Sequence, residues 1–260
     1  MAETGIAKFT IGAWGMKIDG EAELPAGLVT VEDMLPVLHG VGSALVQIAV
    51  AGVESEGHKI SCRAGCGACC RQLVPISEHE ARAIAQMVLD LPEPRRTDVL
   101  LRFREANRRL EETGVRKKIE NLHLVPDAEE RVRIGMEYFQ LGIPCPFLED
   151  ESCSIHPVRP MACREYLVTS DPEFCKNPAG GKVVGVRMPG KPSSALNTFG
   201  TGDGEVRYVV IPLVLSLQFT AANPAPEAQV PAPDMLQRFL RLLAGEGSEP
   251  GGEQAPQGEQ

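Results

Sequence analysis

The chain has 260 residues, 43% of them hydrophobic, so it can bury a sizeable core as one large domain or two small ones. It has 26 basic and 35 acidic residues and a formal net charge of −9. Such a charge repels nucleic acid and anionic membranes, so we expect neither of them as a partner.

The N-terminal sequence, MAETGIAKFTIGAW, lacks the basic start, apolar run and cleavage site of a signal peptide, which predicts a cytoplasmic protein. The most apolar stretch, 208–222, is interrupted by Pro212, Ser216 and Gln218. It is also shorter than the roughly 20 residues that a bilayer helix needs. We interpret it as a core segment.

The first thirty residues alternate loosely between apolar and polar positions. The turn dipeptide Asp19-Gly20 predicts a hairpin that closes at that point. Thr30 then has the character of an N-cap, and an approximate helical stripe continues to Gly52. A hairpin followed by a long helix is therefore expected.

Three further helices are predicted before the second half of the chain. Ser77 and Glu80 form a capping box for the first of them, and an apolar stripe that stops at Gly114 marks the second. Asp127 caps the third, which Gly142 ends. The second of these helices carries several arginines. Nearby glutamates balance their charge, which favours a solvent-exposed face over a surface that docks a partner.

The remainder mixes irregular and regular segments. Residues 145–178 are rich in Pro, Ser and Cys and predict an irregular region. Two strands are predicted at 183–188 and 206–211, pairing with the N-terminal hairpin, and Asp234 is predicted to cap a short amphipathic helix. Residues 245–260 lack large apolar side chains and are predicted to be disordered.

These elements predict an α+β fold that is mainly helical, with a small antiparallel sheet and an irregular cysteine-rich metal-binding region. We expect four parts along the chain: a hairpin and helix (1–56), a cysteine-cluster metal-binding domain (57–180), C-terminal strands and a helix (181–244), and a tail (245–260).

All eight cysteines fall in two clusters. Without an export signal, the reducing cytosol makes metal binding a better explanation than disulfides. The eight candidate metal ligands are Cys62, Cys66, Cys69, Cys70, Cys145, Cys153, Cys163 and Cys175.

The spacing within the first cluster indicates how metal could be held. Cys66 and Cys69 are separated by two residues, a spacing at which a tight turn points two sulfurs at one metal, and Gly65 and Gly67 supply the backbone freedom. Adjacent residues such as Cys69 and Cys70 cannot easily serve one ion, which favours a multinuclear cluster or two sites. Zinc and a [4Fe–4S] cluster each take four such ligands.

Charged residues near the cysteines have a supporting role in this interpretation. Thiolate ligands carry negative charge, and four arginines lie within a few residues of a cysteine: Arg63, Arg71, Arg159 and Arg164. His156 could ligate the metal or donate a hydrogen bond to a ligand, but a solvated loop residue is the favoured reading.

The run CRAGCGACC, followed by CPFLEDESCSIHPVRPMACREY and Cys175, resembles the family of zinc- or iron-chelating cysteine-cluster proteins named for a CxxCxxCC signature. One departure is the three residues between Cys62 and Cys66, which leaves the role of Cys62 least defined. The resemblance implies metal chelation. In a branch related to flagellin lysine methylases it implies an iron–sulfur cluster tied to an oxidative modification.

Two functions follow from these observations. The first is an iron–sulfur protein with a redox or oxidative-modification role, whose [4Fe–4S] ligands come from Cys66, Cys69, Cys70, Cys145, Cys153 and Cys163. The second is a zinc-stapled module that binds another protein without catalysis. The sequence contains no Walker-type loop, dinucleotide fingerprint or nucleophile elbow, so it leaves open whether the protein is an enzyme and which protein partner or substrate it meets.

Overall fold

The computed structural model describes residues 4–13, 16–200, 208–225 and 228–245. The helices among them are α1 (Val31–Ser55), α2 (Glu78–Leu89), α3 (Arg95–Thr113), α4 (Arg116–Glu120), α5 (Ala128–Gln140), α6 (Met161–Glu165), α7 (Pro192–Asn197), α8 (Ser216–Ala222) and α9 (Ala232–Leu243). The strands pair as β1 (Thr4–Ala13) with β2 (Met16–Pro25), β3 (Leu28–Val29) with β8 (Val230–Pro231), β4 (Pro75–Ile76) with β7 (Ile211–Pro212), and β5 (Leu148–Glu149) with β6 (Ser152–Cys153). The predicted fold class is confirmed, with the antiparallel pairing spread over four two-stranded pieces.

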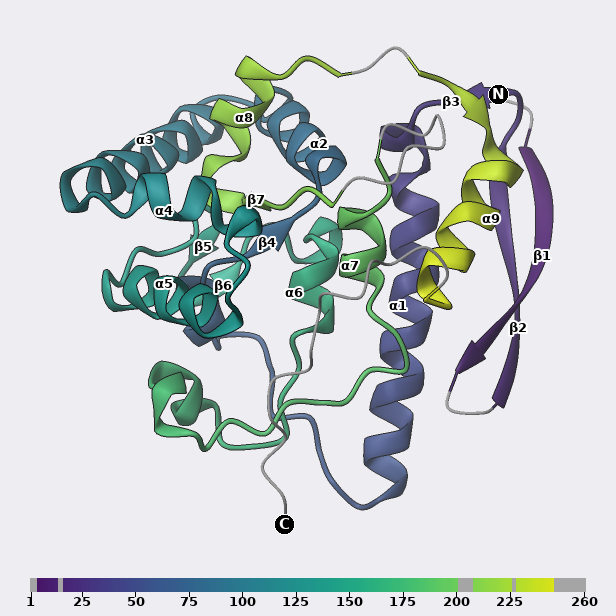
Figure 1. Cartoon of the computed structure of the whole chain (residues 1–260), viewed down its shortest axis with the longest axis horizontal. Helices are drawn as coiled ribbons and strands as arrows, with labels where there is room; N and C mark the ends of the chain where they lie inside the picture. Colours follow the sequence, from purple (N-terminus) through teal and green to yellow (C-terminus); the bar gives the residue numbers. More distant parts are fainter. Residues whose placement is uncertain (1–3, 14–15, 201–207, 226–227, 246–260) are drawn as a thin grey trace.

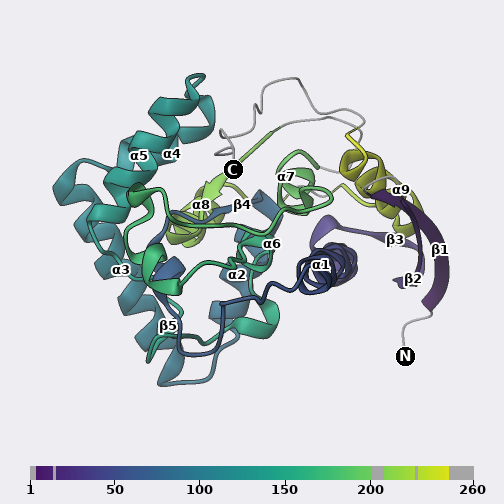
Figure 2. The same cartoon turned by 90° about the horizontal axis from the view of Figure 1, so that it is seen from below.

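The long helix α1 lies in the middle of the molecule (Figures 1 and 2). The β1–β2 hairpin and α9 cover one side of it, and α2 and α6 contact it on another side, with α3, α4 and α5 lying beyond them. One buried cluster joins α1 to α9, α7 and Met161, and a second joins α2 and α3 to Phe147 and Ile211. The short helix α6 therefore stands at the junction of the two halves.

The predicted N-cap at Thr30 and the predicted capping box at Ser77 are both present, and Thr30 also forms a capping box. Thr30 Oγ1 accepts from the amide of Asp33 at 3.2 Å, and the Asp33 carboxylate accepts from the amide of Thr30 at 2.9 Å. Ser77 and Glu80 make the same reciprocal pair at the start of α2, at 3.2 and 3.0 Å. Both boxes satisfy amides that the first helical turn leaves without partners, and so fix where α1 and α2 begin.

The predicted ends of α3 and α5 are present, whereas α1 and α9 differ from the prediction: α1 continues to Ser55, beyond Gly52. Gly114 ends α3 with a φ of 71°, and Asp127 caps α5. The helix α9 begins at Ala232, earlier than the predicted cap at Asp234. The reason is that Pro233 fits the first helical turn, where its missing N–H costs nothing and the negative charge of Asp234 is favourable.

The N-terminal hairpin exists, but the predicted position of its turn is wrong. The strand register pairs Phe9 with Gly20 and Ala13 with Met16, so the chain reverses between Ala13 and Met16, and Asp19-Gly20 lies inside β2. A Cβ on Gly20 would lie 2.7 Å from the ring of Phe9. Gly20 therefore lies under the ring of Phe9, which a larger side chain would have to displace, and not in a turn.

The two predicted C-terminal strands also differ from the structure. Over 183–188 the described pairing is a single bridge between Gly185 and Val168, and Val184 is 57% exposed. Of the strand predicted over 206–211, residues 206–207 lie outside the described part, and Ile211 pairs with β4 instead of the N-terminal hairpin. This ladder is short because it pairs Pro75 with Pro212, and proline has no N–H to donate.

Two apolar stretches bear on membrane contact. The predicted core segment at 208–222 contains the buried residues Leu213, Val214 and Leu215, as expected. The helix α1 is long and apolar enough to cross a bilayer by length and composition, and its buried face also forms part of a core cluster. The tail predicted to be disordered lies, from residue 246, outside the described residues.

The close packing of α1 on α6 gives a testable prediction. A Cβ on Gly42 would lie 2.5 Å from Met161 Cε and 3.0 Å from Pro192 Cβ, whereas nothing lies within 4 Å of one on Gly40. We expect Gly40→Ala to raise the free energy of unfolding by roughly 1 kcal/mol through helix propensity. We expect Gly42→Ala to lower it by about 1 to 2 kcal/mol, because overpacking outweighs propensity. Denaturant unfolding measures both changes, and equal stabilisation by the two substitutions would contradict the packing.

Candidate metal centre

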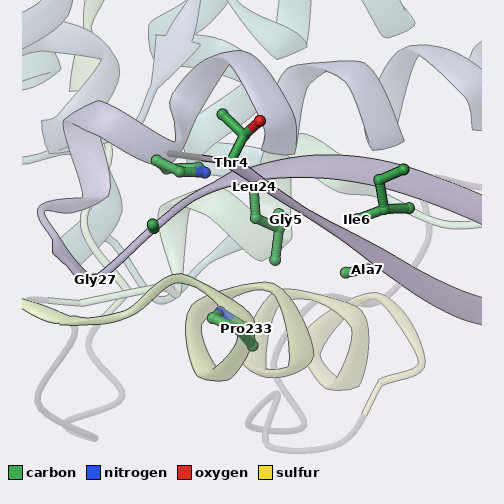
Figure 3. A pocket seen from close by; sticks show the side chains of 9 residues that line it. Thr4, Gly5, Ile6, Ala7, Leu24, Gly27 and Pro233 are labelled. Carbon is green, nitrogen blue, oxygen red and sulfur yellow. The ribbon is translucent and has the colours of Figure 1, made fainter. Parts of the chain in front are cut away.

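A shallow pocket lies at the base of the hairpin, next to the start of α9 (Figure 3). It is lined by Thr4, Gly5, Ile6, Ala7, Leu24, Pro25, Ala26, Gly27 and Pro233. None of these residues carries a titratable or metal-binding side chain. The chemistry of the protein is therefore better sought at the cysteines.

The first cysteine group folds into the tight turn that its spacing predicts. Gly65 has a φ of 80°, in the left-handed region that glycine favours. A short 3₁₀ helix, η1 (Ala68–Arg71), follows, and the amide of Cys70 donates to Gly67 O at 3.0 Å. Successive side chains of a 3₁₀ helix start out roughly 120° apart, but the thiols of Cys69 and its neighbour Cys70 come close enough to share a hydrogen bond.

The β5–β6 hairpin packs directly on this turn. A Cβ on Gly67 would lie 2.6 Å from Glu151 Oε2 and 3.2 Å from Glu151 Cα, so a larger residue there would push the hairpin away from the turn. The Arg71 guanidinium donates to both carboxylate oxygens of Glu151, at 2.9 and 2.6 Å. Cys153, at the end of β6, is thereby held near the first cysteine group.

A backbone hydrogen bond brings Cys145 to the same place. After α5 the chain turns at Gly142, with a φ of 58°, and the amide of Cys145 donates to Cys70 O at 2.7 Å. Gly142 thus ends the helix, as predicted, and directs the following residues to the turn. The two cysteine clusters of the sequence meet at this contact.

The last two cysteines reach the region from short helices. Cys163 lies in α6, and the first amide of that helix, Met161 N, donates to the buried carboxylate of Glu80 at 2.7 Å. Cys175 is buried in η4 (Pro172–Lys176), which contacts η1. The anchoring role of Glu80 was missed by sequence reasoning, because a capping box explains the residue without reference to α6.

The structure brings the eight free cysteines into one region centred on Cys69. Cys69 is close enough for charge interactions or a hydrogen bond with six of the others, namely Cys62, Cys70, Cys145, Cys153, Cys163 and Cys175. Cys66 joins through its interactions with Cys62 and Cys175.

The environment of these thiols opposes ionisation without a cation. Burial raises the pKa of Cys145 to about 12 and also raises the pKa of Cys163, to which the charges of the neighbouring cysteines add. A hydrogen bond with Cys70, followed by burial, raises the pKa of Cys69. Thiolates gathered in this way need a compensating metal cation, because coordination favours the deprotonated sulfur.

The donor set fits a thiophilic metal. Zinc and iron–sulfur clusters take cysteine thiolates, whereas magnesium and calcium prefer oxygen. Among the described residues, no three His, Cys, Asp or Glu side chains are already arranged around a position for one ion. The thiols are thus gathered but spread, and a bound metal would draw them together.

Of the four arginines singled out in the sequence, Arg159 interacts with the largest number of thiols among the described residues. It interacts electrostatically with Cys62, Cys69, Cys153 and Cys163. Arg164 instead donates to the carbonyls of Arg159 and Pro157, both at 2.8 Å. Arg71 is paired with Glu151 and Arg63 is exposed. The positive charge of the Arg159 guanidinium would offset part of the negative charge of metal-bound thiolates.

Three other polar residues near the cysteines have limited roles. His156 is exposed, and its pKa is lowered chiefly by the positive charge of Arg159. Glu165 accepts from the amide and the hydroxyl of Ser193, both at 2.6 Å, and burial raises its pKa to about 6. Tyr166 accepts from Gln72 Nε2 at 3.1 Å. Glu165 is thus used in joining α6 to α7.

Residues 61–180 match the family model described as "CxxCxxCC: Putative zinc- or iron-chelating domain". The matched segment runs from the residue before Cys62 to five residues beyond Cys175 and so contains all eight cysteines. A search of curated proteins found no match to the chain, and a search of solved structures found none. Metal chelation is supported by the family, while the choice between zinc and iron is left to the chemistry of the site.

Proposed function

From the premise that residues 61–180 are a CxxCxxCC metal-chelating domain, we propose that this is a cytoplasmic iron–sulfur protein with a redox role. The observation that carries the proposal is the gathering of eight free thiols around Cys69. A single zinc ion takes four ligands, so this pool exceeds what one structural zinc site needs. A [4Fe–4S] cluster spreads its four cysteine ligands over a larger cube, which suits thiols not yet closed around one ion.

The cluster ligands come from Cys66, Cys69, Cys70, Cys145, Cys153 and Cys163. Bound there, an iron–sulfur cluster supplies one-electron transfer. The surrounding residues bind and tune it. Burial of Cys145 and Cys163 lowers the local dielectric, and the charge of Arg159 favours the more negative, reduced form. The partner or substrate is a protein that exchanges electrons with this centre.

Anaerobic purification followed by visible absorption and analysis of iron, sulfide and zinc tests the proposal. We expect a coloured protein with broad visible absorption and iron and sulfide in equal amounts, about four of each per cluster. A colourless sample with stoichiometric zinc and no iron would overturn the redox role. It would favour a zinc-stapled module, in which the metal holds the irregular region and the surface recruits a partner.

A further inference from the structure

The eight cysteines are not arranged as one ring. Five of them pack on two different hydrophobic clusters, and a sixth, Cys163, joins one of these groups through charge interactions, which gives two trios. Cys62, Cys66 and Cys175, here called the first trio, surround the small cluster of Ala68 and Val168. Cys145, Cys153 and Cys163 form the second trio, and the first two of these pack on the cluster below α2 and α3.

Backbone hydrogen bonds hold the first trio together. The amide of Ser61 donates to Val168 O at 2.9 Å, and its hydroxyl donates to Thr169 O at 3.0 Å. These bonds join the chain before Cys62 to the segment that leads into η4, which contacts η1. Cys175 in turn interacts electrostatically with Cys62 and Cys66.

The second trio is held by the β5–β6 hairpin and by α6. Leu148 pairs with Cys153 across the hairpin, and the amide of Leu148 donates to Cys145 O at 2.9 Å. Cys163 approaches from α6, close enough to interact electrostatically with both Cys145 and Cys153. Three thiols from separate segments therefore converge on one side of the turn.

The Cys69–Cys70 pair stands between the two trios. Cys69 interacts with Cys62 and Cys175 of the first trio, and with Cys145, Cys153 and Cys163 of the second. The carbonyl of Cys70 accepts from the amide of Cys145. Each trio lacks one thiolate for the four-cysteine set that zinc or a [4Fe–4S] cluster takes.

We propose that the domain holds two adjacent metal centres, the first ligated by Cys62, Cys66 and Cys175 and the second by Cys145, Cys153 and Cys163, with the Cys69–Cys70 pair completing both. This inference rests on the proposed metal binding but not on the identity of the metal. It predicts two zinc ions, or two clusters with about eight irons, per chain. With one thiol of the pair completing each trio, all eight cysteines are used.

Metal analysis of the full chain and three variants tests the division. Cys175→Ser removes a ligand of the first centre and Cys153→Ser one of the second, so each variant is the control for the other. We expect each trio variant to retain half of the metal of the wild type. The third variant replaces both Cys69 and Cys70 by serine, which removes the thiol that completes each centre, and it is expected to lose most of the metal. Loss of all metal in both trio variants, or full retention in either, would overturn the proposal.

Titration of the metal-free, reduced wild-type chain with Co²⁺ provides a measurement that does not depend on a variant folding. Saturation of the cobalt–thiolate absorption at two equivalents per chain is expected, and saturation at one would overturn the two centres. Two zinc ions in the protein as purified would refute the iron–sulfur function and leave the two centres standing. A single iron–sulfur cluster per chain would refute the two centres and leave the iron–sulfur function standing.

Discussion

Replacing Glu80 by alanine is expected to lower the free energy of unfolding by about 3 to 5 kcal/mol, the cost of breaking a buried pair by removing one partner. Glu80 Oε1 accepts from His39 Nε2 at 2.9 Å and from Met161 N at 2.7 Å, and Oε2 accepts from the amide of Ser77 at 3.0 Å. Its removal leaves buried donors on α1, α2 and α6 unpaired. Urea unfolding followed by circular dichroism measures the loss.

Two matched variants separate the causes. Glu80→Gln keeps an acceptor oxygen and loses the charge, so its free energy of unfolding should lie between those of the wild type and Glu80→Ala. Gln86→Ala changes an exposed residue of the same helix and should alter stability by no more than about 0.5 kcal/mol. If Glu80→Ala were as mild as Gln86→Ala, the proposed anchoring of α6 would be wrong.

The pH dependence of the free energy of unfolding provides an independent check on the role of Glu80. Burial alone raises its pKa, but the hydrogen bond and charge of His39, together with the amides of Met161 and Ser77, hold the pKa below its ordinary value of 4.5. A carboxylate whose pKa is lower in the folded state than in the unfolded state stabilises the fold at pH values above its unfolded-state pKa. This contribution is lost as the pH falls through the folded-state pKa. The stability difference between the wild type and Glu80→Ala should therefore shrink on acidification below about pH 4.5.

Removing the metal is expected to loosen the cysteine-rich region while leaving the helical core folded. The regular pairing near the cysteines is short: two residue pairs between β5 and β6 and the bridge from Val168 to Gly185. Bound metal would hold these segments, and binding free energy in such sites contributes to folding. Under anaerobic, reducing conditions, chelation should speed amide hydrogen exchange at 61–72 and 145–176 at least about tenfold.

The helix α1 is the internal reference for that experiment. Its buried residues pack on α9 and β2, in a cluster that contains none of the cysteines. Its exchange should change little when the metal is removed. Faster exchange throughout α1 would show that the whole fold depends on the metal, and unchanged exchange at 61–72 would show that the cysteine turn does not.

The sequence predicted well those features that depend on neighbouring residues. The N-cap at Thr30, the capping box at Ser77 and the glycine at the end of α3 are local hydrogen-bonding and backbone signals, and all are present. The turn predicted at Asp19-Gly20 was wrong because Gly20 lies inside a strand, under the ring of Phe9 from the paired strand, a contact that no local pattern reveals.

The candidate centre was predictable in composition but not in arrangement. Cysteine count and spacing indicated metal, and the matching family supports chelation. The central position of Cys69 and the contact between Gly67 and Glu151 depend on segments far apart in the chain, for which the sequence carries no periodic signal. The division of the chain near residues 56, 180 and 244, and the choice of ligands, stay predictions.

The hydrogen bond between Cys145 N and Cys70 O also has a consequence for biosynthesis. About 75 residues separate its two ends, and at 5 to 20 residues per second a ribosome takes roughly 4 to 15 seconds to add them. During that interval the four thiols from Cys62 to Cys70 are outside the ribosome without the second group beside them. A nascent chain would meet oxidants and stray metal ions in this half-assembled state, so metal loading is expected to follow release of α6 from the ribosome.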